Sequence, residues 1–152
     1  AVGRARKAFT KRKVDVTLPA KLPLIRGDAA LLEQVIFNLL DNAHKYSEPQ
    51  SVSRISLTTT AANIVVAVSD SGTGIPRDSL EKVFEKFYRV AGSDGRAPGT
   101  GLGLSICAGI VKGMGGSIIA ESPIDRGQGS RITVTLPLET APASHAGKEA
   151  SP

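Results

Sequence analysis

The sequence predicts an α+β fold: a two-layer α/β sandwich in which a mixed, mostly antiparallel sheet is covered on one face by helices. The first observation is the order of patterns, which reads strand, helix, two strands, short helix, loop, helix, two strands. The second is the short break between strand-like neighbours, which favours antiparallel pairs. The third is the length of 152 residues, which suits one domain with a real core.

The first half of the chain predicts one strand and the strongest helix. Residues 13–19 alternate apolar and polar side chains, as a half-buried strand does. Asp28 stands where a helix N-cap is expected, and residues 29–46 follow with helical spacing before Pro49 stops them. The apolar face of this helix is Leu32, Val35, Ile36, Leu39 and Ala43.

The remaining elements follow from similar patterns. Residues 52–60 and 63–70 alternate and are separated by two residues, which predicts an antiparallel pair. The second half then predicts a partly helical segment at 77–89, a mobile Gly-, Ser- and Pro-rich loop at 90–101, an apolar helix at 102–114 ended by two glycines, and strands at 117–122 and 130–138.

Charge and composition divide the chain into three parts. Six basic residues and no acid fall in the first thirteen positions, whereas the other 139 carry 13 basic and 14 acidic residues. We therefore expect a basic segment at 1–12, a domain at 13–138 that does not bind nucleic acid, and a disordered tail at 139–152. The single cysteine, Cys107, lies in an apolar run and is expected to be a buried structural thiol. No apolar stretch approaches the ~20 residues of a membrane span, so we expect these residues to be soluble, whether alone or as part of a larger protein.

The helix at 29–46 carries a polar stripe as well as its apolar face. Gln34, Asn38, Asn42 and Lys45 recur at four- and three-residue steps. Asparagine is roughly 0.6 kcal/mol worse than alanine in a helix, and solvent faces normally use Glu, Lys and Arg. A ligand-binding stripe is therefore favoured over a solvent face, because amide oxygens ligate Mg²⁺ and amide NH₂ groups donate to phosphate.

Two glycine-rich loops accompany this stripe. Asp70 ends a predicted strand and is followed by Gly72 and Gly74, an arrangement that suits an exocyclic amine on a flat ring but also describes an ordinary turn containing an acid. The run "GTGLGLSI" leads into a helix N-terminus, where free backbone amides make an anion site, and the loop before it would cover a triphosphate as a lid. It lacks the lysine of the common P-loop.

Four runs in order resemble the sequence boxes of one family: "EQVIFNLLDNAHKYS", "DSGTGIP", "FEKFYR" and "GTGLGLSI". They are similar to the catalytic ATP-binding domain of bacterial sensor histidine kinases, whose fold is shared with gyrase, a heat-shock chaperone and mismatch-repair ATPases. The resemblance covers about residues 13–138. Within the family, the chain most resembles the KdpD group of potassium sensors.

The resemblance implies a role for each matching residue. Asn38 matches the Mg²⁺ ligand, and Asn42 and Lys45 match phosphate contacts. The other matches are Tyr46 stacking on adenine, Asp70 reading the adenine amine with Gly72 and Gly74 shaping that pocket, Phe84 and Phe87 anchoring the lid, Arg89 near the γ-phosphate, and Gly99, Thr100, Gly101, Leu102 and Gly103 as the phosphate loop. Asn38, Lys45 and Arg89 would be the catalytic members.

The resemblance also implies a function and partners. The chain would bind ATP and Mg²⁺ and donate the γ-phosphoryl group to a histidine on a dimerisation domain, from which a response regulator receives it. It would be a cytoplasmic domain that reaches the inner membrane only through the rest of its parent. Neither His44 nor His145 matches the acceptor histidine, and the general base of the family neighbours that acceptor, so little turnover is expected from this chain alone. Arg131 is a lesser departure, at a position where the family usually has an aromatic or apolar residue.

Two other functions stay open at this point. One is a serine kinase of the anti-sigma type, which has the same boxes and needs no acceptor histidine. The other is a non-enzymatic, nucleotide-gated interaction module, which the presence of Asn38, Asn42 and Asp70 disfavours.

Overall fold

The computed structural model describes residues 13–25, 27–91, 99–124 and 127–139. These residues form β1 (Lys13–Thr17), α2 (Ala29–Lys45), β2 (Val52–Thr59), β3 (Asn63–Asp70), the 3₁₀ turns η1 (Arg77–Ser79) and η2 (Lys82–Phe84), α3 (Gly103–Gly113), β4 (Ser117–Glu121) and β5 (Ser130–Pro137). The strands and the two long helices fall where the sequence predicts them, within two residues at each end. The predicted basic segment, most of the predicted lid and nearly all of the predicted tail lie outside the described residues.

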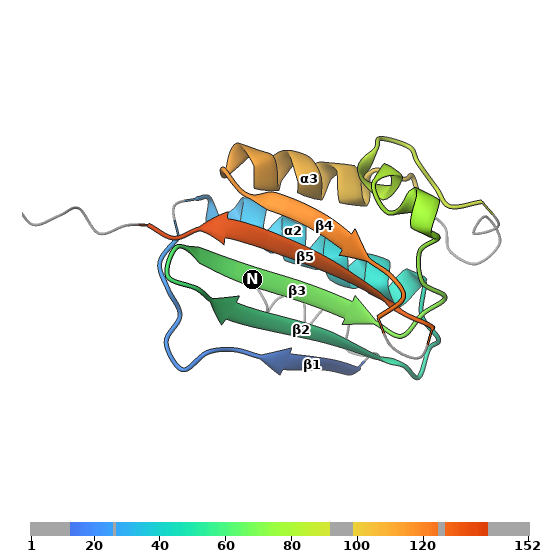
Figure 1. Ribbon diagram of the computed structural model, residues 1–152, viewed down its shortest axis with the longest axis horizontal. Coiled ribbons are helices and arrows are strands. Elements are labelled where there is room, and N and C mark those ends of the chain that lie inside the picture. The colour runs from blue at the N-terminus through green and yellow to red at the C-terminus, as the bar shows by residue number, and fades with distance from the viewer. Residues whose placement is uncertain (1–12, 26, 92–98, 125–126, 140–152) are drawn as a thin grey trace, which may run out of the picture.

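The five strands form one sheet in the order β1-β2-β3-β5-β4 (Figure 1). β1 and β2 are parallel, and every other neighbouring pair is antiparallel, so the expected mixed, mostly antiparallel sheet is confirmed. The parallel pair exists because α2 lies between β1 and β2 in the chain and returns it to the same edge of the molecule. The β2–β3 hairpin is closed by Thr60, whose N–H donates to the Asn63 carbonyl at 2.8 Å.

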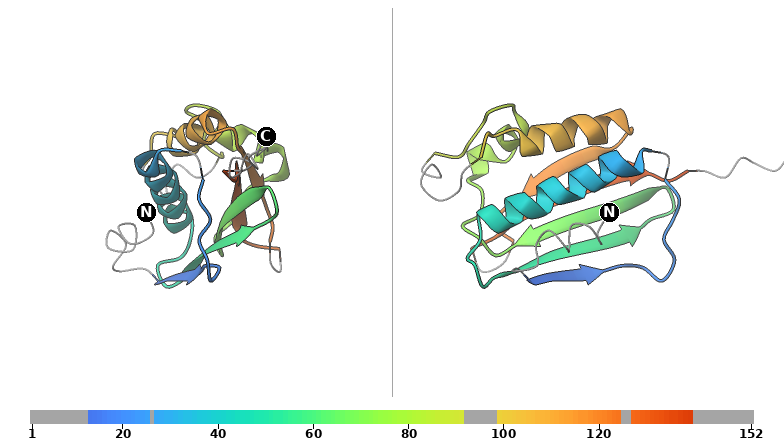
Figure 2. Two further views of the ribbon diagram at one scale, coloured as in Figure 1. Left: turned by 90° about the vertical axis from the view of Figure 1, so that its left-hand side faces the viewer. Right: turned by 180° about the vertical axis from the view of Figure 1, so that it is seen from behind.

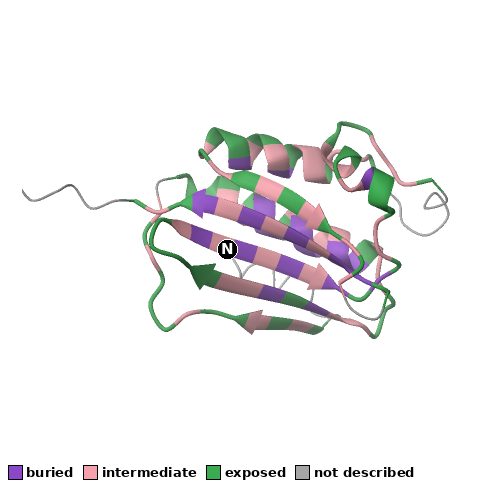
Figure 3. Ribbon diagram, viewed as in Figure 1, coloured by how far each residue is buried: buried purple, intermediate pink, exposed green. Residues whose placement is uncertain are grey.

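Both long helices cover one face of the sheet, as the two-layer prediction requires (Figure 2). The core lies between these layers, and the strands alternate buried and less buried residues along β3 and β5 (Figure 3). Four of the five predicted apolar positions of α2 are buried, while Leu32 is half-buried. The apolar core consists of Val35, Ile36, Leu39, Leu40, Ala43, Ile55, Ile64, Val66, Val68, Cys107, Val111, Ile132, Val134 and Leu136.

The two helices begin differently. The Asp28 carboxylate caps α2 by accepting from Ala30 N at 2.7 Å and Leu31 N at 3.2 Å, which confirms the predicted N-cap. α3 has Leu102 at its N-cap position, and no side chain caps its first turn. The first amides of α3 are therefore open to another acceptor. Among the described residues, no helix has both the length and the apolar character to cross a bilayer.

The segment at 77–89 contains less helix than a continuous helical run would give. It holds two separate 3₁₀ turns, and the chain leaves the helical region at Glu85, where ψ is 148°. Phe87 then adopts a left-handed backbone conformation, with φ 64°. A helix cannot pass through an aromatic residue in that region, so the segment turns back on itself instead.

Candidate functional site

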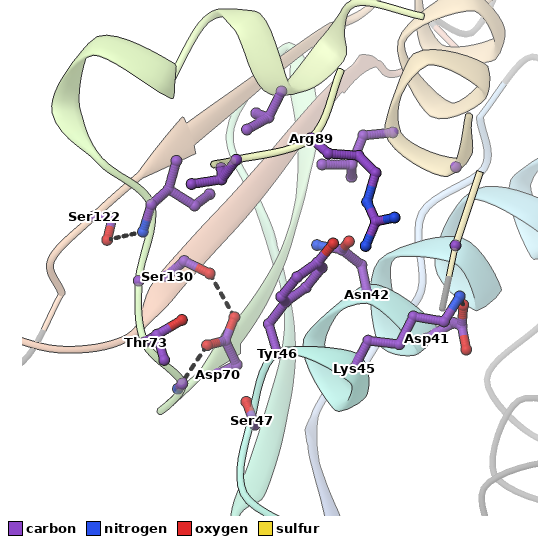
Figure 4. A pocket seen from close by; sticks show the side chains of 18 of the residues that line it. Asp41, Asn42, Lys45, Tyr46, Ser47, Asp70, Thr73, Arg89, Ser122 and Ser130 are labelled. Atoms are coloured by element: carbon purple, nitrogen blue, oxygen red, sulfur yellow. Dashed lines mark hydrogen bonds and ion pairs between the residues drawn. The ribbon is translucent and has the colours of Figure 1, made fainter. Parts of the chain in front are cut away.

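A cavity of about 1210 Å³ opens near the C-terminal ends of α2 and β3 and the N-terminal end of α3, and Figure 4 shows side chains that line it. Its volume exceeds the roughly 300–1,000 Å³ of typical small-molecule pockets. Every residue that the sequence matched to a nucleotide, phosphate or Mg²⁺ contact lines it, although those residues come from four separate stretches of chain. They are Asn38, Asn42, Lys45, Tyr46, Asp70, Gly72, Gly74, Arg89, Gly99, Thr100, Gly101, Leu102 and Gly103. Their individual roles stay predictions.

Asp70 is a buried carboxylate held by two donors. Only 8% of the residue is exposed. Gly72 N donates to Asp70 Oδ1 at 2.8 Å, and the Ser130 hydroxyl donates to Oδ2 at 2.5 Å. Ser130 reaches it because Asp70 and Ser130 are direct partners across β3 and β5. Two donors fix the plane of the carboxylate, and each oxygen retains a lone pair for a ligand N–H.

The first glycine loop needs its glycines for contacts within the chain. A Cβ on Gly72 would lie 2.1 Å from the Tyr46 carbonyl oxygen. Gly74 has φ +79°, and a Cβ there would lie 2.7 Å from Ser122 Oγ. The expectation that these glycines serve the approach of a flat ring is therefore incomplete, because packing against the end of α2 and the residue after β4 already requires them.

Ser122 ties this loop to the turn between β4 and β5. Ile75 N donates to Ser122 Oγ at 2.9 Å, and the same hydroxyl donates to the Gly129 carbonyl at 2.8 Å. Gly129 N in turn donates to the Gly72 carbonyl at 3.0 Å. Sequence reasoning missed both Ser122 and Ser130. The register between β3 and β5 would have indicated Ser130, but that register is a long-range feature that local patterns do not carry.

Only some residues of the polar stripe of α2 line the cavity. Asn38, Asn42 and Lys45 line it, whereas Gln34 lies outside the lining. Asn38 Nδ2 donates to the Gly103 carbonyl at 3.4 Å, which orients the amide and leaves Oδ1 as an acceptor. Lys45 Nζ pairs with Asp41 Oδ2 at 2.6 Å.

Cys107 is fully buried, as predicted. Burial raises the pKa of the Cys107 thiol from 9.0 to about 11, and a hydrogen bond with the Asn38 side chain offsets part of that rise. The thiol also lies 3.7 Å from the Val35 carbonyl. A protonated, buried thiol is a packing group and not a nucleophile.

In the second glycine loop, the backbone conformation and packing require glycine at one position but not at two others. Gly101 has φ +71°, and a Cβ there would lie 2.8 Å from the Phe87 carbonyl carbon. A Cβ on Gly103 would meet nothing within 4 Å, and one on Gly99 would meet only Lys45 Nζ at 3.9 Å. The fold therefore does not need glycine at 99 or 103, and both positions line the cavity beside the uncapped start of α3.

The two predicted aromatic anchors differ. Phe84 is half-buried and packs against the core. Phe87 is 70% exposed, and its contribution is a backbone one: its N–H donates to the Gly101 carbonyl at 3.0 Å and joins the two sides of the predicted lid at its base. Arg89 is half-buried, and its side chain points toward Asn42 in Figure 4.

The comparisons with known proteins agree with this geometry. Residues 27–140 match the family model described as histidine kinase-, DNA gyrase B-, and HSP90-like ATPase. Sensor protein KdpD of Clostridium acetobutylicum is 39% identical over 134 residues, which cover 87% of this chain and 14% of that protein. Signal transduction histidine-protein kinase BaeS of Escherichia coli is 40% identical over 143 residues, which cover 91% of this chain and 30% of that protein.

A solved structure shares the fold closely. The mycobacterial sensor histidine kinase MprB superposes with a TM-score of 0.78 at 29% identity, and the match covers 92% of this chain and 91% of that one. The chain spans only about a seventh to a third of the length of the curated relatives it matches. It belongs to the family of histidine kinase-, gyrase- and HSP90-like ATPases, and within that family it is a catalytic domain of the sensor histidine kinase type.

Proposed function

We propose that the cavity binds Mg·ATP, with the adenine at Asp70 and the triphosphate between α2 and the start of α3. One observation carries this proposal: a buried carboxylate fixed by two donors shares a cavity with an uncapped helix N-terminus flanked by glycines that the fold does not need. The first feature suits a neutral ring that carries an amine. The second suits an anion.

The adenine end owes its selectivity to Asp70. The exocyclic amine of adenine donates an N–H to a carboxylate lone pair, whereas guanine presents a carbonyl oxygen at that position and is repelled. Tyr46 would stack on the ring, since it ends α2 at the edge of the same cavity. Gly72 and Gly74 would keep the loop close to the end of α2 and to Ser122, which leaves room for the base.

The phosphate end would hold charge with neutral and cationic groups. Asn38 Oδ1 is a hard oxygen ligand suited to Mg²⁺, which neutralises the phosphates when bound. Asn42, Lys45 and Arg89 would donate to phosphate oxygens. The second glycine loop would bring backbone amides against the terminal phosphates, where a side chain at 99 or 103 would take up ligand space. Its members are Gly99, Thr100, Gly101, Leu102 and Gly103.

The reaction proposed for the parent protein is phosphoryl transfer to a histidine on a helical dimerisation domain outside this chain. The bond from the γ-phosphorus to the bridging oxygen breaks, a P–N bond to the acceptor imidazole forms, and ADP leaves. The domain contributes positioning and charge neutralisation, which is most of what such a reaction asks of a protein. From the acceptor histidine, the phosphoryl group would pass to an aspartate of a response regulator. His44 of this chain is a poor acceptor because it lies within α2 with only 5% of its surface exposed. We place this domain on the cytoplasmic side of an inner-membrane sensor.

The direct experiment mixes this chain with γ-labelled Mg·ATP and a separately purified dimerisation domain of its parent. The proposal predicts label on the acceptor that is lost in acid and retained in base, as a phosphohistidine is. The chain alone should retain little label. An acid-stable label on a partner serine would support the serine kinase alternative, and failure of the wild-type chain to bind ATP would support the interaction module.

A further inference from the structure

The ammonium of Lys45 lies close to an acid and to the second glycine loop. Lys45 Nζ is 2.6 Å from Asp41 Oδ2, one turn earlier on α2. It also lies 3.9 Å from the position that a Cβ on Gly99 would occupy. Asp41 and Lys45 both line the cavity, and Figure 4 shows the two side chains together on the same face of α2.

A helical pair of this spacing is common on protein surfaces and contributes little stability when exposed. The side chains of Asp41 and Lys45 are each 36% exposed, so the pair is partly screened. Its location distinguishes it from an ordinary surface pair. Lys45 is one of the residues proposed to contact the phosphates. Asp41 places a full negative charge in the cavity lining, next to the proposed position of the triphosphate.

We propose that Asp41 pairs with Lys45 and repels the free triphosphate, which makes tight binding of the nucleotide depend on Mg²⁺. This inference rests on the proposed function. ATP without a divalent cation carries about two more negative charges than Mg·ATP, so the Asp41 carboxylate repels the free nucleotide more strongly. While Lys45 is paired with Asp41, the carboxylate neutralises part of its charge, so Lys45 offsets less of this repulsion.

The test is calorimetric titration of Asp41→Asn and wild type with ATP, at low ionic strength, in excess EDTA and in excess Mg²⁺. In EDTA, Asp41→Asn should bind ATP about three- to tenfold more tightly than wild type, because one repulsive charge is gone and Lys45 is released. In Mg²⁺ the two proteins should agree within about twofold, so the Mg²⁺ enhancement shrinks. Added salt should reduce the difference seen in EDTA.

A gain of affinity cannot come from misfolding, which keeps this test interpretable. The matched control is Asp15→Asn, which makes the same charge change at an exposed position of β1, away from the cavity lining. It should leave both affinities unchanged. Equal or weaker binding of free ATP by Asp41→Asn, or an unchanged Mg²⁺ enhancement, overturns the inference while the proposed function stands. Failure of the wild type to bind ATP even with Mg²⁺ overturns both.

Discussion

The Ser130 hydroxyl donates a 2.5 Å hydrogen bond to the Asp70 carboxylate across two neighbouring strands. Both residues are buried, with 6% and 8% of their surface exposed. The carboxylate assigned to adenine is thus aimed from β5, by a residue 60 positions later in the chain. The orientation of Asp70 therefore depends on the neighbouring strand as well as on its own loop, where Gly72 N donates to the other carboxylate oxygen.

Removing that hydroxyl should weaken nucleotide binding. Hydrogen bonds to a charged group contribute about 1.5–3 kcal/mol, so Ser130→Ala should lower the affinity for ATP by about tenfold or more. Ser130→Thr keeps the donor and should bind ATP within about threefold of wild type. Titration calorimetry of the three proteins decides this, and equal affinities for wild type and Ser130→Ala would contradict it.

The Ser122 hydroxyl should support the adenine end by holding the first glycine loop to the β4–β5 turn. Ser122→Ala should weaken ATP and ADP by the same factor, about three- to tenfold, because the base end is common to both nucleotides. The ratio of ATP to GTP affinity should fall as well. Titrating the wild type and Ser122→Ala with ATP, ADP and GTP gives the loss of affinity for each nucleotide and the change in the ratio of ATP to GTP affinity.

Thr60 provides a matched control for Ser122. Its Oγ1 also joins two backbone groups, accepting from Asn63 N at 3.1 Å and donating to the Asn63 carbonyl at 3.3 Å. It lies in the β2–β3 turn and does not line the cavity. Thr60→Val should cost a similar amount of stability, about 1 kcal/mol, without changing any nucleotide affinity. A loss of affinity in both variants would mean that Ser122 acts only through stability.

Two glycines of α3, Gly103 and Gly109, allow the effect of a side chain on stability to be distinguished from its effect on ligand binding. A Cβ on Gly103 or on Gly109 would meet nothing within 4 Å. Gly109→Ala should raise the free energy of unfolding by about 0.5–1 kcal/mol and leave ATP binding unchanged. Gly103→Ala should fold at least as stably as wild type yet bind ATP more weakly, because Gly103 lines the cavity and Gly109 does not. Urea unfolding and calorimetry report the two effects, and unaltered ATP affinity in Gly103→Ala would remove the case for a phosphate contact there.

The buried Cys107 thiol should make stability fall at alkaline pH. Its pKa is raised from 9.0 to about 11 in the folded state, so the unfolded chain releases this proton first. The stabilisation is fully present below about pH 9 and is lost as the pH rises toward about 11, by at most about 2–3 kcal/mol. Urea unfolding from about pH 8 to about pH 10.5 should show a steeper fall for wild type than for Cys107→Ala. Parallel curves would show that the thiol ionises equally in both states.

Local patterns predicted most of the fold. The Asp28 cap, the apolar face of α2 and the alternating strands each involve residues close in sequence, so their periods identify them. The pairing of β1 with β2 and of β3 with β5 depends on long-range contacts that periodicity does not report. The partly helical segment expected at 77–89 consists of two 3₁₀ turns. The left-handed Phe87 that follows donates its N–H to the Gly101 carbonyl, a long-range contact that the local pattern does not report.

The site was predicted as a set of residues but not as a geometry. Asparagines in mid-helix are a locally unfavourable choice, and that conflict is visible in the sequence. The glycines beside Asp70 also suit an ordinary turn and were assigned to the site through the resemblance. Ser122, Ser130 and Asp41 make no such conflict, since serine near a turn and an acid four residues before a lysine are ordinary. Only the three-dimensional contacts show that Ser122 reaches the first glycine loop, that Ser130 reaches Asp70 and that Asp41 reaches Lys45.

The most direct measurement is calorimetric titration of the chain with ATP and with GTP, each with and without Mg²⁺, repeated on Asp70→Asn. We predict ATP binding that Mg²⁺ strengthens, little binding of GTP, and a loss of about tenfold or more for ATP in the variant. The loss is expected because a side-chain amide has only one acceptor oxygen. With that oxygen accepting from Gly72 N, the NH₂ group replaces Oδ2, and the variant loses an acceptor for the adenine amine. Equal binding of ATP and GTP, or an unchanged ATP affinity in Asp70→Asn, would contradict the placement of adenine at Asp70.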